Sequence, residues 1–200
     1  MKSCLAVILL VLVINPAFAV VDPDPNSLGV YFDLEAESNY LDVDPATVFS
    51  AYVTLTDPTW DHVRAFEFGY ELMVPSGMEG SIFRLAEILP PCSIDIEWRD
   101  PLGGDYIIGM GLPYPTSEAT VLVQWVFLLI APMTIEYYLG PSSAPSVPDN
   151  LPAIMNDENI IMSVGISSGD VNLPVAEVNT GHQPVPAQMA SWGGVKSLFR

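Results

Sequence analysis

The sequence predicts an all-β protein, built as an antiparallel β-sandwich of about nine strands. Three features of the 200 residues lead to this prediction: repeated alternation of apolar and polar residues with a period of two, a longer apolar run over residues 121–131, and turns rich in Pro, Gly, Asn, Asp and Ser between these segments. Alternation of this kind places one face of each strand on a core and the other toward water.

The alternating segments supply the first strands in chain order. They cover residues 30–35, 49–55, 66–72, 93–98 and 106–112. In the fourth segment, the alternation places Trp98 in the core. Cys92 directly precedes this segment, and we expect a buried, inert thiol because free cysteines are among the most buried residues.

The apolar run over residues 121–131 predicts a central strand. It is interrupted only by Gln124, is rich in Val and Phe, and is followed by Pro132. A buried helix is the alternative, since periodicity does not separate the two structures in such a run. The run is too short to cross a membrane as a helix. Two further strands are expected over residues 133–139 and 160–166.

The N-terminus has the pattern of a cleavable signal peptide, predicted for residues 1–19. Lys2 precedes an apolar stretch over residues 5–14, and Ala17-Phe18-Ala19 places small residues where a signal peptidase cleaves. A retained membrane anchor is the alternative, but a spanning helix needs ~20 apolar residues. We therefore expect a bacterial protein that is secreted, extracellular or at the cell surface, or else periplasmic, with no stable membrane span after cleavage. Because Cys4 lies in this segment, no internal disulfide is expected.

Residues 20–178 are expected to form one sandwich domain, followed by a linker and C-terminal tail over residues 179–200. In the tail, Trp192, Val195 and Phe199 have the spacing i, i+3, i+7 of one face of a short helix. The tail resembles the short C-terminal ends of many secreted bacterial proteins. Two interpretations stay open: a sorting or docking peptide in which Trp192 and Phe199 bind, or a terminal helix that packs on the sandwich.

The charge balance excludes one class of partner. The chain has 24 acidic and six basic residues, for a net charge of −18. Such a surface repels phosphate backbones, so nucleic-acid binding is not expected. Half of the residues are apolar, which argues for a packed core rather than disorder. An acidic surface of this kind suits high salt or divalent cations.

The one apparent catalytic motif lacks its structural context. Gly165 to Gly169 match the G-x-S-x-G nucleophile elbow, which requires a strand before it and a helix after it. The following residues, 170–174, end in proline and predict no helix. With two histidines, His62 and His182, a zinc site is not expected either. We expect a turn at this motif, no catalytic residue and no enzyme.

Carboxylates suggest a structural calcium site, the only cofactor that we consider. Calcium takes several oxygen ligands from loops, and the candidates, spaced two apart in two pairs or lying in an acidic loop, are Asp22, Asp24, Asp42, Asp44 and Asp157. Plain solvated acidic loops are the alternative. Trp60, beside Asp61 and His62, is a candidate binding residue that could stack on a sugar; an ordinary loop is again the alternative.

Four stretches carry a resemblance to a known family: residues 48–55, 63–70 with alternating aromatics, 121–127, and 134–139 behind them. Their order and pattern resemble the cohesin-type β-sandwich, which some carbohydrate-binding modules and jelly-roll folds share in outline. The resemblance covers roughly residues 27–166. Nothing matches a dockerin-contacting motif, so it assigns no binding residues.

The expected function is that of a non-enzymatic, secreted or surface-exposed module that binds a partner protein or a polysaccharide, or forms part of a surface assembly. A fold of this kind does not by itself select the ligand. Two alternatives stay open: a secreted glycoside hydrolase that uses two carboxylates, and a structural surface protein whose acidity is an adaptation to salt.

Overall fold

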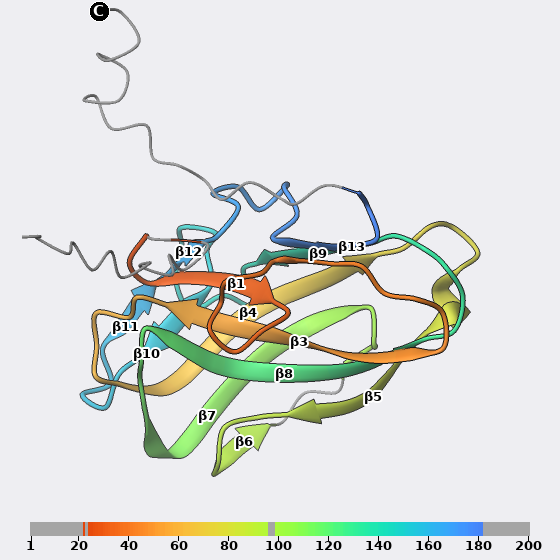
Figure 1. Cartoon of the computed structure of the whole chain (residues 1–200). Helices are drawn as coiled ribbons and strands as arrows, with labels where there is room; N and C mark the ends of the chain where they lie inside the picture. The colour runs from red at the N-terminus through yellow and green to blue at the C-terminus, as the bar shows by residue number, and fades with distance from the viewer. Residues whose placement is uncertain (1–21, 23, 96–98, 182–200) are drawn as a thin grey trace, which may run out of the picture.

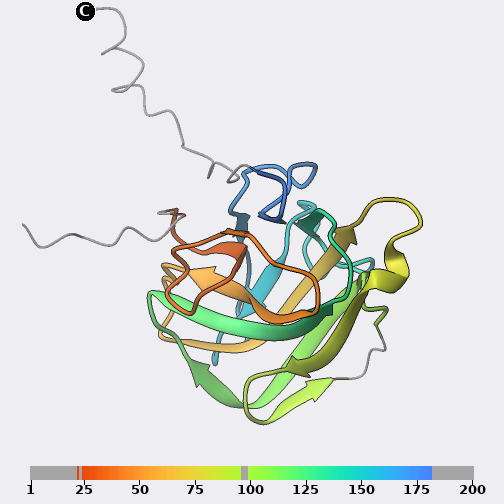
Figure 2. The same ribbon diagram turned by 45° about the vertical axis from the view of Figure 1, so that its right-hand side comes forward.

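The structure is a computed structural model that describes residues 22, 24–95 and 99–181. Two β-sheets pack face to face around one core (Figures 1 and 2), which confirms the predicted β-sandwich. No helix among the described residues is long and apolar enough to cross a membrane. The predicted signal peptide and C-terminal helix lie outside the described residues.

The smaller sheet has five strands in the order β12-β1-β3-β8-β5. Their bounds are β1 (Ser27–Tyr31), β3 (Thr47–Thr56), β5 (Ile82–Ile88), β8 (Ala119–Leu129) and β12 (Gly165–Ile166). The strand β8 lies between β3 and β5, so the apolar run forms a central strand as predicted and not a buried helix.

The larger sheet has eight strands. Six of them follow the order β11-β10-β4-β9-β13-β2, and two lie off this path: β7 pairs with β4, and β6 pairs with β7. A short 3₁₀ turn, η1 (Glu79–Ser81), precedes β5. The bounds of these strands are β2 (Tyr40–Leu41), β4 (His62–Met73), β6 (Ser93–Asp95), β7 (Gly103–Pro115), β9 (Ile135–Gly140), β10 (Ala153–Met155), β11 (Ile161–Ser163) and β13 (Ala176–Val178).

The described residues thus contain thirteen strands rather than about nine. Most of the additional ones are two or three residues long, too short to show a period of two in the sequence. The exception is β5, whose seven residues do not alternate between apolar and polar. Two of them, β12 and β2, add parallel edge pairings, to β1 and β13 respectively, in sheets that are otherwise antiparallel.

Much of the core consists of residues that alternation predicted to point inward. On β4 these are Phe66, Phe68, Tyr70 and Leu72, all buried, and they pack against the fully buried Trp125 of β8 and its neighbours. The intervening residues of β4 point to the outer face of the larger sheet. The alternation therefore fixes which side chains of this strand are available to a ligand.

Several positions depart from the predicted burial. Leu34 is exposed because β1 ends at Tyr31 and does not continue to residue 35. Cys92 is exposed, not buried, because it lies in a turn with φ of 64° before β6. Ile94 is exposed because it lies on the outward side of β6, at the margin of the sheet. Leu112 is exposed where β7 runs past the core toward its hairpin with β8. Trp98, predicted to be buried, lies outside the described residues.

A buried arginine joins the two sheets at one margin of the sandwich. The Arg99 guanidinium donates hydrogen bonds to Glu87 Oε1 of β5 and to Asp95 Oδ2 of β6, each at 2.9 Å. It also lies over the ring of Tyr106, with its central carbon 3.8 Å from the ring centroid. Because β5 belongs to the smaller sheet and β6 and β7 to the larger one, this single side chain ties their margins together.

Tyr106 extends this contact into the core. Its hydroxyl accepts a hydrogen bond of 2.6 Å from Trp125 Nε1 and donates one to Glu87. Arg84 lies alongside, 3.3 Å from Glu87 and donating at 2.7 Å to the hydroxyl of Tyr70. The charged groups are thus satisfied by one another, which is the condition for keeping charge inside a protein.

Replacing Arg99 is expected to destabilise the fold. In Arg99→Ala, the buried guanidinium no longer packs on Tyr106. Asp95 loses its ion pair with Arg99, and Glu87 keeps only Arg84 and Tyr106 of its contacts. Because Asp95 and Glu87 are only partly buried, we expect a loss of about 2 kcal/mol. Urea unfolding measures the loss. Arg64→Ala is the matched control, because Arg64 forms no ion pair with any other described residue, and it should change the free energy of unfolding by less than about 0.5 kcal/mol. Equal midpoints for the two variants would contradict this role of Arg99.

Candidate functional site

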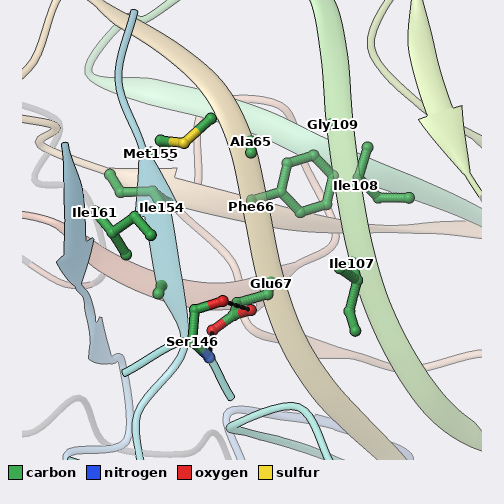
Figure 3. A pocket seen from close by; sticks show the side chains of 11 residues that line it. Ala65, Phe66, Glu67, Ile107, Ile108, Gly109, Ser146, Ile154, Met155 and Ile161 are labelled. Atoms are coloured by element: carbon green, nitrogen blue, oxygen red, sulfur yellow. Dashed lines mark hydrogen bonds between the residues drawn. The ribbon is translucent and has the colours of Figure 1, made fainter. Parts of the chain in front are cut away.

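The outer face of the larger sheet carries an apolar groove of about 260 Å³ (Figure 3). Strands β4, β7, β10 and β11 form it, and the segment between β9 and β10 closes one end. The lining residues are Ala65, Phe66, Glu67, Ile107, Ile108, Gly109, Ser146, Ala153, Ile154, Met155 and Ile161.

Strand register explains the shape of the groove. Across the sheet, one row of paired residues runs Ile161, Met155, Ala65, Gly109, Ile94. The two isoleucines at its ends are 47% and 61% exposed, whereas the middle of the row holds the two smallest side chains. The row is therefore raised at its ends and hollow at its centre.

Gly109 forms the floor of the hollow. A Cβ atom built on Gly109 would meet no atom within 4 Å, and its φ is not in the left-handed region that favours glycine. Nothing within the fold thus requires glycine here. A glycine inside a strand often marks a place where a ligand or another backbone approaches closely.

Glu67 forms the polar end of the groove. Its side chain is buried, and it accepts a hydrogen bond of 2.6 Å from the Ser146 backbone N–H and one of 2.8 Å from the Ser146 hydroxyl. Both bonds are visible in Figure 3. They fasten the segment between β9 and β10 over the sheet, so the carboxylate serves the fold and does not stand free as an acid or base.

The groove suits side chains of a partner better than a free small molecule. Its walls are aliphatic, and its volume lies below the roughly 300–1,000 Å³ of typical small-molecule sites. It is open along the sheet, between exposed isoleucines. The chemistry that it offers is burial of apolar side chains against a shallow, largely preformed surface.

The carboxylates predicted to bind calcium lie in three separate segments: before β1, between β2 and β3, and between β10 and β11. Asp22 is buried and accepts a hydrogen bond of 3.0 Å from the Asp24 N–H. Asp42 accepts one from the Tyr40 hydroxyl, and it and Asp44 are exposed. Within residues 22, 24–95 and 99–181, no three Asp, Glu, His or Cys side chains are grouped so that they could hold a metal ion. The calcium site stays a prediction.

Two other predicted residues meet in a polar hollow of about 430 Å³. Trp60 lies before β4, and Asp157 lies in the exposed turn between β10 and β11. The Trp60 side chain is half-buried and packs partly against the core; its role in binding stays a prediction. Trp192 and Phe199, the other candidate binding residues, lie outside the described residues.

The G-x-S-x-G segment forms the predicted turn. Gly165 and Ile166 make up β12, and the Gly169 N–H, at φ of 73°, donates a 2.7 Å hydrogen bond to the Ile166 carbonyl. Ser167 is buried under β1 and not presented at a sheet edge as a nucleophile. The groove residues were missed at the sequence level; the outward-pointing Gly109 within an apolar strand was the available signal.

Solved structures with a similar fold are cohesin modules. The sixth cohesin of scaffoldin B from Acetivibrio cellulolyticus, solved in complex with a Cel5 dockerin mutant, has a TM-score of 0.51 and 8% identity, over 78% of this chain and 99% of that one. A type II cohesin domain from the cellulosome of the same organism has a TM-score of 0.48 and 9% identity, over 78% and 96%.

A type I cohesin in the Coh-OlpA complex from Clostridium thermocellum has a TM-score of 0.48 and 8% identity, over 76% and 96% of the two chains. No family model and no curated protein sequence matches this chain. At this level of identity the likeness concerns the fold: the chain is a cohesin-like β-sandwich.

The buried Asp22 makes stability depend on pH. Burial is the main cause that raises the pKa of its carboxyl group, and Asp24 and Asp57 raise it further, whereas hydrogen bonds from Ser27 and the Asp24 N–H lower it. The folded pKa lies above the unfolded one, so the contribution of Asp22 to stability is full at low pH and is lost as the pH rises through the folded value.

Asp22→Asn is therefore expected to stabilise the protein at pH 7, because asparagine keeps the acceptor for the Asp24 N–H without the buried charge. The gain should shrink as the pH approaches 3. Urea unfolding at both pH values measures it. The same substitution at the exposed Asp44 is the control. A gain that is equal at both pH values would show that the charge of Asp22 is not the cause.

Proposed function

We propose that this protein is a non-catalytic, secreted or surface-exposed module that binds a partner protein on the outer face of its larger sheet. The observation that carries the proposal is the groove over Ala65 and Gly109, flanked by exposed Ile94 and Ile161. The fold adds support: the similar scaffoldin B cohesin was solved with a dockerin protein as its partner.

The character of the groove favours a protein over a polysaccharide. A sugar is held by an open aromatic ring together with converging polar groups. The groove presents aliphatic side chains instead, and the carboxylate of Glu67 is already bonded to Ser146. Exposed apolar patches on a soluble protein mark interaction sites, and pockets that receive a few apolar anchors dominate protein interfaces.

The carboxylates of the margin argue against a hydrolase. Glycoside hydrolysis needs two carboxyl groups facing a bound sugar across a cleft. Glu87 and Asp95 form ion pairs with Arg99, and Glu87 also accepts from Tyr106. These contacts hold both groups in place as structural anions.

Gly109 allows binding to be separated from folding. Gly109→Val adds a side chain where no atom lies within 4 Å, and β-branched residues favour strands. We expect the melting temperature to stay equal or to rise, while the groove is filled. We expect the affinity of the Gly109→Val variant for the partner protein to fall at least tenfold, about 1.4 kcal/mol. Gly109→Ala should lower this affinity less.

Photo-crosslinking identifies that partner. A benzophenone amino acid at the exposed position of Ile94 should crosslink one protein among those secreted by the source organism. The same probe at Leu173, which is 51% exposed and lies outside the groove, is the control. The crosslinked species should be absent from the control and lost on adding Gly109→Trp. A product that survives Gly109→Trp would place the interaction elsewhere and overturn the proposal.

A further inference from the structure

The smaller sheet presents a second outer face, and it carries no charged side chain. Strand pairing arranges this face in three rows across β3, β8 and β5. The rows are Val48-Leu128-Phe83, Ser50-Val126-Ala86 and Tyr52-Gln124-Ile88. Val48, Phe83 and Ile88 are each about half exposed, as is Leu85 at the bulge of β5. On a chain with 24 acidic residues, a sheet face without charge is an exception.

One end of this face deepens into a groove of about 500 Å³. Apolar residues from four segments form its walls: Leu34, Ile88, Leu89, Tyr114 and Leu122, with three prolines beside them. Exposed acidic residues border it, since Glu35 follows Leu34 and Glu118 lies between the lining residues Ser117 and Ala119. An occupant that fits would combine apolar side chains with positive charge.

The C-terminal segment of the chain has this composition. All 24 acidic residues lie between Asp22 and Glu177, so the segment that follows contains none, whereas it contains Lys196 and Arg200. Its apolar residues Trp192, Val195 and Phe199 have the spacing of one helix face. The body and this segment are therefore opposite in charge, and the body attracts the segment.

The segment is also long enough to reach the face. The described body ends at Gly181, and the residues up to Arg200 could span about 60 Å when extended. Attachment to the same chain gives the segment an effective concentration on the order of millimolar, so a weak apolar contact suffices to hold it.

We propose that residues 189–200 dock on the outer face of the smaller sheet of their own chain. Trp192, Val195 and Phe199 contact the apolar rows, and Lys196 and Arg200 face the acidic border. This places the tail on the opposite side of the sandwich from the partner groove. Docking of the tail and binding of the partner protein therefore use separate surfaces, so an experiment that contradicts one of them does not contradict the other.

A spin label on Cys92 tests this position. Cys92 is exposed and follows Pro91, which lines the groove; Cys4→Ser leaves it as the one thiol. In the full ¹⁵N-labelled chain, we expect loss of the Trp192 indole N–H signal, which Trp192→Phe identifies. In the control, Cys92→Ser with Glu71→Cys moves the label to the outer face of the larger sheet, and the Trp192 signal should persist.

Two sets of substitutions decide the contact. Val126→Lys on the face should restore the signal with the Cys92 label, whereas Met73→Lys, at an exposed position of the larger sheet, should not. Lys196→Glu with Arg200→Glu should restore it too, and these changes lie outside the sandwich, so they leave its folding intact. A signal that persists with the Cys92 label, or that stays lost in the tail variant, would overturn the proposal.

A mixing experiment distinguishes docking within one chain from docking on a second copy. Spin-labelled chains without ¹⁵N are combined with ¹⁵N chains that carry Cys92→Ser and Cys4→Ser. We expect the Trp192 signal of the ¹⁵N chains to remain. Its loss in the mixture would mean that the tail docks on a second copy, which contradicts docking within one chain.

Discussion

The ion pairs of Arg99 hold the two sheets in register at the margin where they meet. On one side lies Glu87 of β5, and on the other Asp95 of β6, with the ring of Tyr106 beneath the guanidinium. The position of β6 matters beyond the margin, because β6 contributes Ile94 to one end of the partner groove. The ion pairs of Arg99 thus help to hold β6 in the position where its outward residue Ile94 borders the groove.

The local pattern of the sequence was sufficient for the two sheets and for the inside and outside of the long strands. Residues 66–72 and 49–55 alternate as they do because their inward side chains fill the core. The pattern fails at the margins. Cys92 lies in a turn, and Ile94 belongs to a strand too short for alternation to identify its buried face. Gly109 within an apolar strand was the one signal of the groove in the sequence. The groove itself depends on Ala65 and Gly109 being neighbours across two strands, and this register is a property of strand pairing and not of either segment alone.

The distribution of charge gives the two outer faces a shared property. The net charge of −18 repels other acidic proteins of similar size, so contact is easiest where the surface is neutral. Both outer faces contain neutral surface, and the two differ in shape. The larger sheet is hollowed by small residues and fits protruding anchors, whereas the smaller sheet is broad and uncharged and fits a flat amphipathic segment. The acidity therefore need not be a binding signal; it confines approach to the surfaces that lack it.

The short strands at the sheet edges restrict the direction from which a partner can arrive. In the described residues, the sheets end in β12, β11, β2 and β6, each two or three residues long, and in β5, whose pairing is interrupted between Arg84 and Ala86. Unpaired edges are the template on which extended peptides add as further strands and on which sheets aggregate. Edges this short or irregular offer few free backbone groups with which an extended peptide could pair as an added strand. Selectivity must then come from side chains that meet a face, and the same geometry protects the protein from joining copies of itself edge to edge.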